Sequence, residues 1–308
     1  MKSKLFEKIF SVEKNYANII IYFLGIKITL KRRYVDYGFI NCHVSNEIFV
    51  ANCIKAMHSK TFPKYKNCHK GQDIVLVATG PTLNYYSPIQ NGVHIGVNRA
   101  YKNPNIKLDY LFVVDFNGTN KENIEEIVNY PANIFLGTYY SLNTSAREHS
   151  IPLIYKELPH VNCYAIDFPR NLRYPDLEFC GLMDYGSTIF NAAHFATYTH
   201  PKRIYLVGCD CSNTGHYDNS PPYNDLRVDC ILNGWIMFKE YCSWYYPDVE
   251  IISINPIGLK GLFKDVYTQS YVNDHPELLK EDIEILDDEI INNIKNNKEG
   301  EKEICLNQ

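Results

Sequence analysis

The sequence predicts an α/β fold with a mostly parallel sheet and helices on both of its faces. Three observations predict it. Short apolar runs without polar alternation recur along the chain, as in strands that are buried on both sides. Segments with helical spacing of apolar residues lie between these runs, so strands and helices alternate. Hydrophobic residues make up 45% of the 308 residues and charged residues 21%, which is typical of a globular protein with a sizeable core.

Turn residues bound each expected element of the sheet. The expected strands are residues 73–79, 94–98, 110–114, 132–136, 203–208 and 249–254. The expected helices are residues 122–130, 187–199 and 225–246, with a short helix that starts at Thr82 or Leu83. Residues 138–180 contain four prolines, and we expect them to form an irregular insertion over one face.

The chain is expected to have three parts: an N-terminal appendage at residues 1–70, a catalytic domain at 71–270, and a helical, partly disordered tail at 271–308. In the appendage, residues 19–24 and 26–30 flank Gly25, which favours a β-hairpin. The same apolar run precedes a basic cluster that ends in Arg33, so it also fits peripheral contact with an anionic membrane surface. Both interpretations stay open.

Composition excludes several classes of protein. The net charge of −4 argues against a nucleic-acid partner. The ten cysteines are scattered without a CxxC pair, so we expect reduced thiols and no metal site. The first residues have mixed charge and no apolar core, which is unlike a secretory signal. We therefore expect a cytoplasmic protein, with any membrane contact at the inner face of the inner membrane. A homo-oligomer is left open.

Ligands of open α/β sheets bind outside the carboxyl ends of the strands. The loops to examine are therefore residues 79–83, 98–101, 115–119 and 209–225. In the first of them, Gly80 allows close backbone approach, and the start of a helix offers N–H groups to a phosphate. A plain strand-to-helix turn is the alternative. The predicted nucleotide-binding residues of this turn are Thr79, Gly80, Pro81 and Thr82.

Polar residues also follow the other strands. Asn98 could bind a base or ribose, and Asp115 could bind ribose hydroxyls or a metal. Turn capping is the alternative for Asn98, and capping by Asp115 and Asn117 is the alternative for the third strand's end. Gly186 and Ser187 precede the helix rich in small residues, where an anion or a simple N-cap would fit. Asp210 ends the last strong strand of this set, and it completes the predicted nucleotide site.

The loop after Asp210 carries the predicted catalytic residues. His216 stands beside a glycine in a polar loop at the carboxyl edge of the sheet, where an imidazole can act as a general base. Tyr217 could donate its hydroxyl to a leaving phosphate. An exposed histidine without a catalytic role is the alternative.

The order of these motifs resembles that of family 42 sialyltransferases. The segments are "LVATGPTL", "GVNRAY", "GSTIFNAAHFA", "KRIYLVGCD" with its polar loop, and "ISINPIGLKGLF", which together span about residues 73–263. The resemblance implies a Rossmann-like, GT-A-like sheet with a lid-like loop. It also implies inverting, metal-independent transfer of sialic acid or a related sugar from a CMP-activated donor to a glycan. The N-terminal "FLGIKITLKRR" looks like pieces of enzymes that build bacterial capsule or lipooligosaccharide. No cofactor is implied.

The family's residues carry over unevenly. Thr79 stands where the family has an asparagine that contacts CMP, and Asn98 and Ser187 match nucleotide-site positions. Asp115 or Asn117 falls near a second asparagine of the family that contacts the nucleotide. Tyr217 matches the later of two lid tyrosines, whereas Ser212 replaces the earlier one. The family's base is a histidine just before the long helix, where this chain has Pro222 to Asn224, so His216 is the substitute base.

Two other functions remain open. The turn and the "LVGCD" strand also look like motility-associated glycosyltransferases and the related 6-hydroxymethylpterin diphosphokinases. A pyrophosphokinase would need Mg²⁺ held by carboxylates such as Asp115 and Asp210. The second alternative is a non-catalytic module that binds a nucleotide or a glycan.

Overall fold

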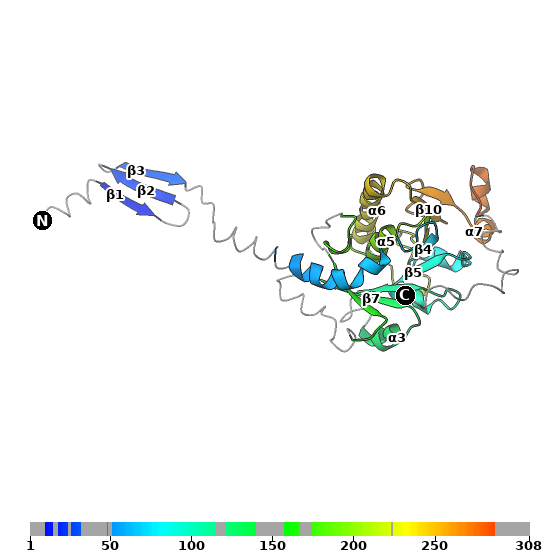
Figure 1. Cartoon of the computed structure of the whole chain (residues 1–308). Helices are drawn as coiled ribbons and strands as arrows, with labels where there is room; N and C mark the ends of the chain where they lie inside the picture. Colours follow the sequence, from blue (N-terminus) through cyan, green and yellow to red (C-terminus); the bar gives the residue numbers. More distant parts are fainter. Residues whose placement is uncertain are drawn as a thin grey trace. The chain divides into compact units, whose positions relative to one another are not determined.

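The structure is a computed structural model. It describes residues 10–14, 18–23, 26–31, 48, 51–114, 121–139, 157–166, 174–222 and 224–286. The chain divides into two compact units, Met1–Phe49 and Val50–Gln308 (Figure 1). Asp115 and Asn117 lie outside the described residues, as does most of the predicted tail.

The smaller unit contains a three-stranded antiparallel sheet in the order β1, β2, β3. Its strands are β1 (Phe10–Lys14), β2 (Asn18–Phe23) and β3 (Ile26–Lys31). The hairpin predicted on either side of Gly25 is confirmed as β2 and β3. β1 was not predicted, although its alternation of apolar and polar residues is a strand pattern.

The larger unit is built on an eight-stranded sheet in which every pair of neighbouring strands is parallel. The strand order is β11-β10-β9-β4-β5-β6-β7-β8. This confirms the predicted Rossmann-like fold class. The strands are β4 (Asp73–Val77), β5 (Val93–Val97), β6 (Tyr110–Val113), β7 (Asn133–Tyr139), β8 (Val161–Ile166), β9 (Arg203–Val207), β10 (Glu250–Ile254) and β11 (Lys264–Val266).

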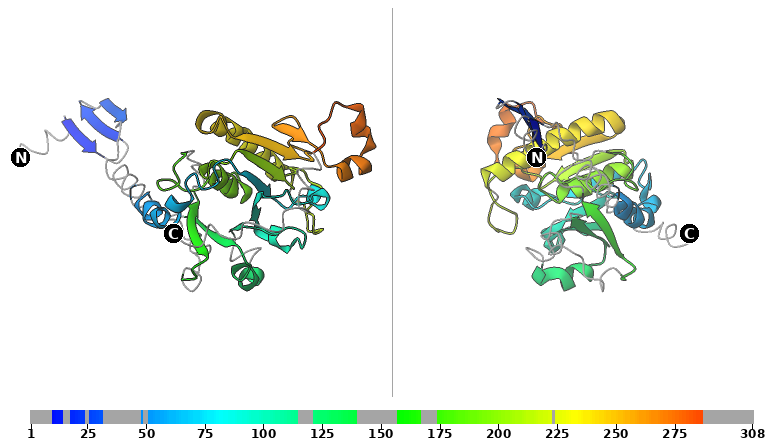
Figure 2. Two further views of the ribbon diagram at one scale, coloured as in Figure 1. Left: turned by 45° about the vertical axis from the view of Figure 1, so that its right-hand side comes forward. Right: turned by 90° about the vertical axis from the view of Figure 1, so that its left-hand side faces the viewer.

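Both faces of this sheet are buried, which explains the continuous apolar runs of its strands. Ile74 and Leu76 of β4 pack in a core with α5 (Ile189–Tyr198) and α6 (Asp225–Tyr245). Val75 and Val77 of the same strand pack on the other face with residues of α3 (Ile124–Val128). Figure 2 shows α5 and α6 on one side of the sheet and α3 on the other.

Short helices fill the connections of the larger unit. They are η1 (Pro63–Tyr65), η2 (Pro81–Tyr85), η3 (Asn98–Lys102), η4 (Lys121–Asn123), α7 (Gln269–Asp274) and η6 (Pro276–Lys280). Among the described residues, no helix is both long and apolar enough to cross a bilayer.

The structure differs from the expectations in two places. Residues 138–180, expected to be irregular, contain β8, whose burial the prolines around it obscured. Residues 51–61 are helical, and the core next to them includes Phe62 and Tyr65, so the expected boundary at residue 70 moves to residue 49. The described start of the tail contains the end of α7 and the short η6, and Ile285 forms an isolated bridge with Tyr267.

Two buried histidines, His58 and His194 of α5, hydrogen-bond through both ring nitrogens to backbone groups of neighbouring segments. His58 Nδ1 lies 2.6 Å from Leu177 O, and its Nε2 accepts from Ala165 N at 2.8 Å. His194 Nδ1 accepts from Met183 N at 3.2 Å, and its Nε2 lies 2.8 Å from Tyr174 O. Each ring therefore donates one bond and accepts one, which fixes a neutral tautomer. Burial lowers the pKa of both histidines to about 4.

Candidate functional site

The order in which strands are added to the sheet reverses between β4 and β9, although all the strands are parallel. From β4 the chain proceeds through β5 toward β8, and it later returns to β9 on the other side of β4 and continues to β11. Such a switch point leaves a crevice at the carboxyl ends of the two strands, where open α/β sheets bind ligands.

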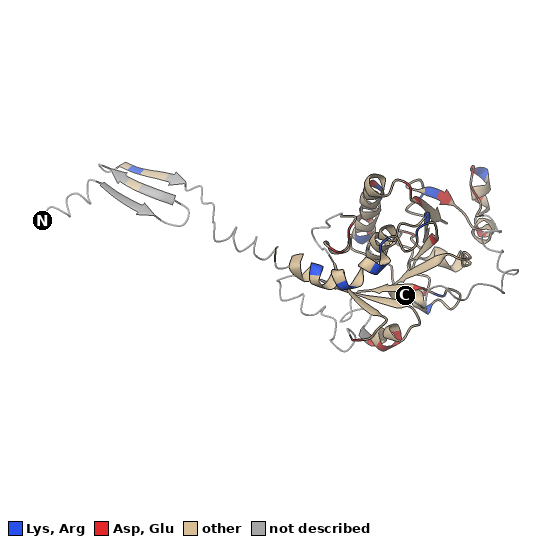
Figure 3. Cartoon of the chain, in the orientation of Figure 1, with Lys and Arg blue, Asp and Glu red and all other residues tan. Residues whose placement is uncertain are grey.

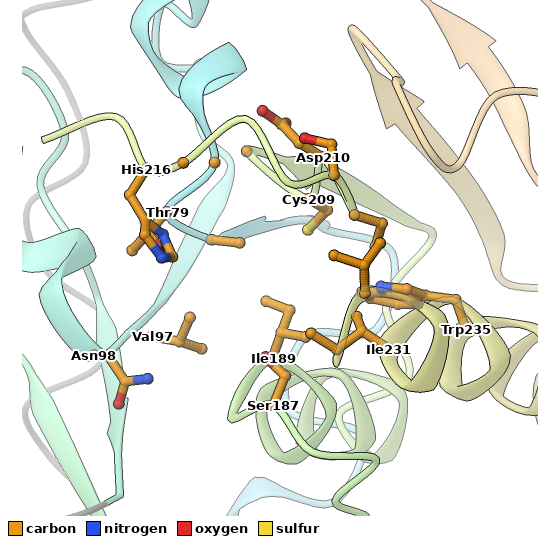
Figure 4. A pocket seen from close by; sticks show the side chains of 17 residues that line it. Thr79, Val97, Asn98, Ser187, Ile189, Cys209, Asp210, His216, Ile231 and Trp235 are labelled. Atoms are coloured by element: carbon orange, nitrogen blue, oxygen red, sulfur yellow. Dashed lines mark hydrogen bonds between the residues drawn. The ribbon is translucent and has the colours of Figure 1, made fainter. Parts of the chain in front are cut away.

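A pocket of about 600 Å³, partly open to solvent, lies at this crevice (Figure 4). The carboxyl ends of β4, β5 and β9, the start of α5, one side of α6 and the loop after β9 all contribute to it. It is lined by Ala78, Thr79, Gly80, Val97, Asn98, Ser187, Ile189, Gly208, Cys209, Asp210, Cys211, Ser212, Gly215, His216, Val228, Ile231 and Trp235.

The turn after β4 packs directly against the end of β9. Gly80 N donates to Gly208 O at 2.8 Å. A Cβ at residue 80 would lie 2.6 Å from that oxygen and 2.5 Å from Asp210 Cγ. Gly208 has a φ of +64°, which favours glycine. The two glycines therefore allow two strand ends to touch at the floor of the pocket.

A buried carboxylate fastens the same turn. Asp210 is 4% exposed, and its Oδ2 accepts from Thr82 N at 2.9 Å while its Oδ1 accepts from the Thr82 hydroxyl. Burial raises the pKa of Asp210, and the two bonds from Thr82 oppose that rise. Thr82 and Asp210 thus join the turn to β9, and Thr82 serves the turn from behind rather than lining the pocket.

The close contact at Gly80 predicts that Gly80→Ala reduces both stability and ligand affinity. An added methyl group must displace the Gly208 carbonyl or the Asp210 side chain, and such overpacking costs about 1–3 kcal/mol. Thermal unfolding and nucleotide titration measure the two effects. Gly92→Ala is the control. Gly92 lies just before β5, at the amino ends of the strands, and an added Cβ there would have its nearest contacts at 3.3 Å. Equal effects of the two substitutions would contradict this role of Gly80.

His216 is held against the same turn from the loop after β9. Its Nδ1 lies 2.9 Å from Thr79 Oγ1, and Tyr217 N donates to Thr79 O at 2.9 Å. Burial lowers the pKa of His216, and the nearby positive charge of Arg99 lowers it further. The imidazole is therefore mainly neutral at pH 7, which is the form that a general base requires.

An ion pair holds the rest of this loop to η3. Arg99 Nε lies 3.5 Å from Asp218 Oδ2, and an Arg99 terminal nitrogen donates to Ser220 Oγ at 2.6 Å. Burial alone would raise the pKa of Asp218, but hydrogen bonds from Ser220 and the charge of Arg99 bring it below its usual value. The Tyr217 hydroxyl donates to Arg99 O at 2.9 Å. These contacts fix the segment that carries His216.

The opposite wall joins the end of β5 to the start of α5. Asn98 has a φ of 46°, a left-handed conformation that asparagine tolerates better than most residues, and its Nδ2 donates to Thr188 Oγ1 at 3.1 Å. Thr188 is the N-cap residue of α5, and its side chain makes no capping hydrogen bond. Ser187 and Ile189 bring the positive end of the helix dipole to the pocket.

The remaining wall is apolar. Val228, Ile231 and Trp235 project from one side of α6 at spacings of three and four residues, and Cys209 and Cys211 face them from the loop after β9. Burial raises the pKa of the Cys209 thiol and raises that of Cys211 to about 12, so both remain protonated. The sequence prediction gave these cysteines as reduced thiols without a metal. It missed the α6 wall, although the helical spacing of its apolar residues was visible.

The structure brings together most of the predicted residues that it describes. The pocket is lined by Thr79, Gly80, Asn98, Ser187, Asp210 and His216. Pro81, Thr82, Gly186 and Tyr217 are adjacent in sequence but do not line it. Pro81 begins η2, and Gly186 has a φ of +82°. The predicted roles of Asp115 and Asn117 fall outside the described residues.

One of the two carboxylates proposed for Mg²⁺ under the pyrophosphokinase alternative, Asp210, is already engaged in hydrogen bonds, and the other, Asp115, lies outside the described residues. Both oxygens of Asp210 accept hydrogen bonds from Thr82. Within the described ranges, no group of three or more His, Cys, Asp or Glu residues is placed to hold a metal ion. The geometry of Asp210 therefore fits a structural role better than metal coordination.

Comparison with known proteins gives similarity to several solved structures, among them two of a bacterial sialyltransferase. The sialyltransferase CstII from Campylobacter jejuni, in complex with the substrate analogue CMP-3FNeuAc, is 17% identical over 59% of this chain and 80% of its own, with a TM-score of 0.38. A mutant of the alpha-2,3/8-sialyltransferase CstII is 16% identical over 59% and 81% of the two chains, with a TM-score of 0.36. No family model and no curated protein matches the chain.

Proposed function

We propose that this protein is a glycosyltransferase that binds a CMP-activated sugar in the pocket between β4 and β9. One observation carries the proposal: the Gly80 turn, Asn98 and the N-terminus of α5 surround a half-buried His216 in its neutral form. The first three suit a nucleotide and its phosphate, and the fourth suits proton abstraction. The sequence resemblance to family 42 sialyltransferases supports a CMP-linked sialic acid or a related sugar.

The chemistry would be a single displacement. His216 removes the proton from an acceptor hydroxyl, the acceptor oxygen attacks the anomeric carbon, and the bond from that carbon to the phosphate oxygen breaks. The anomeric configuration is inverted because the attack occurs opposite the leaving group. The helix dipole at Ser187 stabilises the charge on the departing nucleotide without a metal ion. Assistance from the Tyr217 hydroxyl would require its bond to Arg99 O to break.

The acceptor under this proposal is a glycan, and the pathway is the synthesis of bacterial surface polysaccharide or lipooligosaccharide. The pocket is open on one side, which leaves room for a second substrate. The activated donor would come from the cytoplasm, so transfer would take place there or at the inner face of the inner membrane.

CMP or a CMP-sugar is expected to raise the melting temperature more than CDP, UDP, GDP or ATP. A ligand that binds only the folded state at 100 times its Kd stabilises it by about 2.7 kcal/mol. Differential scanning fluorimetry measures the shifts, with EDTA and Mg²⁺ arms for each nucleotide. A shift with ATP alone, dependent on Mg²⁺, would favour the pyrophosphokinase. CMP-sugar binding without transfer or hydrolysis across a panel of glycan acceptors would favour the non-catalytic module.

A further inference from the structure

The sheet of the smaller unit is amphipathic along all three strands. Antiparallel pairing places Ile21 opposite both Val12 and Ile28, and it places Phe23 opposite both Phe10 and Ile26. Directly paired residues share a face, and residues two apart in a strand share it too. Eight of the nine positions on this face are therefore apolar, and we call it the apolar face: Phe10, Val12, Ile19, Ile21, Phe23, Ile26, Ile28 and Leu30, with Lys14 at one end.

The opposite face has a different composition. Its positions are Ser11, Glu13, Asn18, Ile20, Tyr22, Lys27, Thr29 and Lys31. A sheet with one apolar and one polar face normally covers the apolar one. Here Ile26 is 62% exposed and Ile28 is 45% exposed, although both belong to the apolar face. Large apolar side chains gathered on an exposed surface indicate an interaction site.

Charge separates the two units and identifies the occupant. Residues 1–49 contain eight Lys and Arg and four Asp and Glu, a net charge of +4, whereas residues 50–308 contain 23 and 31, a net charge of −8. Lys31, Arg32 and Arg33 directly follow the apolar positions of β3. In Figure 3 the described part of β3 carries blue and no red. The partner of this unit must therefore offer an apolar phase for the isoleucines and negative charge for the basic residues.

We propose that the apolar face of β1, β2 and β3 docks on an anionic lipid bilayer, with its isoleucines among the acyl chains and the basic residues that end and follow β3 at the lipid phosphates. A bilayer supplies the apolar phase and the negative charge together. A second copy of the sheet would bring two units of charge +4 together and supply no counter-charge. The net −8 of the larger unit opposes binding to the same surface, so the smaller unit would carry the affinity.

Ile28→Asn and Thr29→Asn form a matched pair for testing this proposal. The two residues are adjacent on β3, both are exposed, neither substitution changes charge, and they lie on opposite faces. The full-length protein is sedimented with vesicles of phosphatidylglycerol and phosphatidylethanolamine, and with vesicles of phosphatidylcholine. Ile28→Asn is expected to weaken binding to the anionic vesicles at least about 10-fold, since a buried isoleucine supplies that much affinity. Thr29→Asn should change it less than about twofold.

Charge is tested separately with Lys31→Gln, Arg32→Gln and Arg33→Gln combined. This variant should lose about 100-fold in binding to the anionic vesicles, at about 1 kcal/mol for each charge. Wild-type binding should also fall as salt is raised. Equal binding to neutral and anionic vesicles, or equal effects of the two asparagine substitutions, would overturn the proposal. A dimer in light scattering that Ile28→Asn dissociates, without vesicle binding, would assign the face to a second copy. None of these outcomes changes nucleotide binding by the larger unit, so none of them bears on the proposed function.

Discussion

His216→Ala is expected to lower turnover about 10²–10⁴-fold, the range for loss of a general base. Donor affinity should change little. The substitution removes the bond from His216 to Thr79, but the other contacts of the turn stay in place. Steady-state kinetics with a CMP-sugar donor and direct donor titration give the two quantities. His160→Ala is the control, since this exposed histidine precedes β8 at the opposite edge of the sheet.

The pH profile gives a second readout of the same residue. Burial and Arg99 lower the pKa of His216, so kcat/KM should rise with pH through a pKa below the ordinary 6.5. Arg99→Gln removes one cause and should move that pKa upward. If His216→Ala retains more than about a third of wild-type turnover, His216 is not the base, and Asp218 and Asp225 become the next candidates.

Acid is expected to destabilise the larger unit steeply because of His58 and His194. Their pKa values of about 4 in the folded state compare with about 6.5 in the unfolded chain. Between these values the unfolded chain binds more protons than the folded one, so stability is full above pH 6.5 and falls as the pH decreases toward 4. A lowered pKa of this size makes protonation of each folded imidazole about 3 kcal/mol less favourable than protonation in the unfolded chain.

Urea denaturation at a series of pH values measures this effect. Around pH 5 the free energy of unfolding should change by about 1.4 kcal/mol per pH unit for each of the two protons. His58→Gln and His194→Gln should each be less stable at pH 7 but show a shallower dependence on pH. His160→Gln, at an exposed position just before β8, is the control substitution. A wild-type free energy that stays constant from pH 6.5 to 5 contradicts the expectation.

The sequence predicted the parts of the fold that local patterns determine. Runs such as residues 73–79 and 203–208 are apolar throughout because both faces of the sheet are covered, and that pattern is visible without a structure. The N-terminus of α6 was also placed correctly, since Asn224 caps it by accepting from Arg227 N. β8 was missed because its burial depends on contacts with β7 and with His58, which lies 107 residues from Ala165 in the sequence.

The site was predicted in part for a similar reason. Glycines and polar residues at strand ends identified Gly80, Asn98 and His216, because the carboxyl ends of parallel strands converge. Which side chains face the pocket depends on partners that lie elsewhere in the sequence. Thr82 is turned to Asp210, 128 residues away, and the Tyr217 hydroxyl is bonded to Arg99, 118 residues away. The apolar wall from α6 likewise depends on how that helix packs.

Four contacts join the turn at residues 79–82 to the segment 208–217, so the two stretches depend on each other and must be kept together. Gly80 touches Gly208, Thr82 binds Asp210, and Thr79 contacts both His216 and Tyr217. If the loop after β9 were replaced by that of another protein, a histidine at position 216 would keep its contacts only if the matching turn at residues 79–82 were transferred too. Recombination that separates the two stretches, which lie far apart in the gene, would therefore break the site even when each half remains intact.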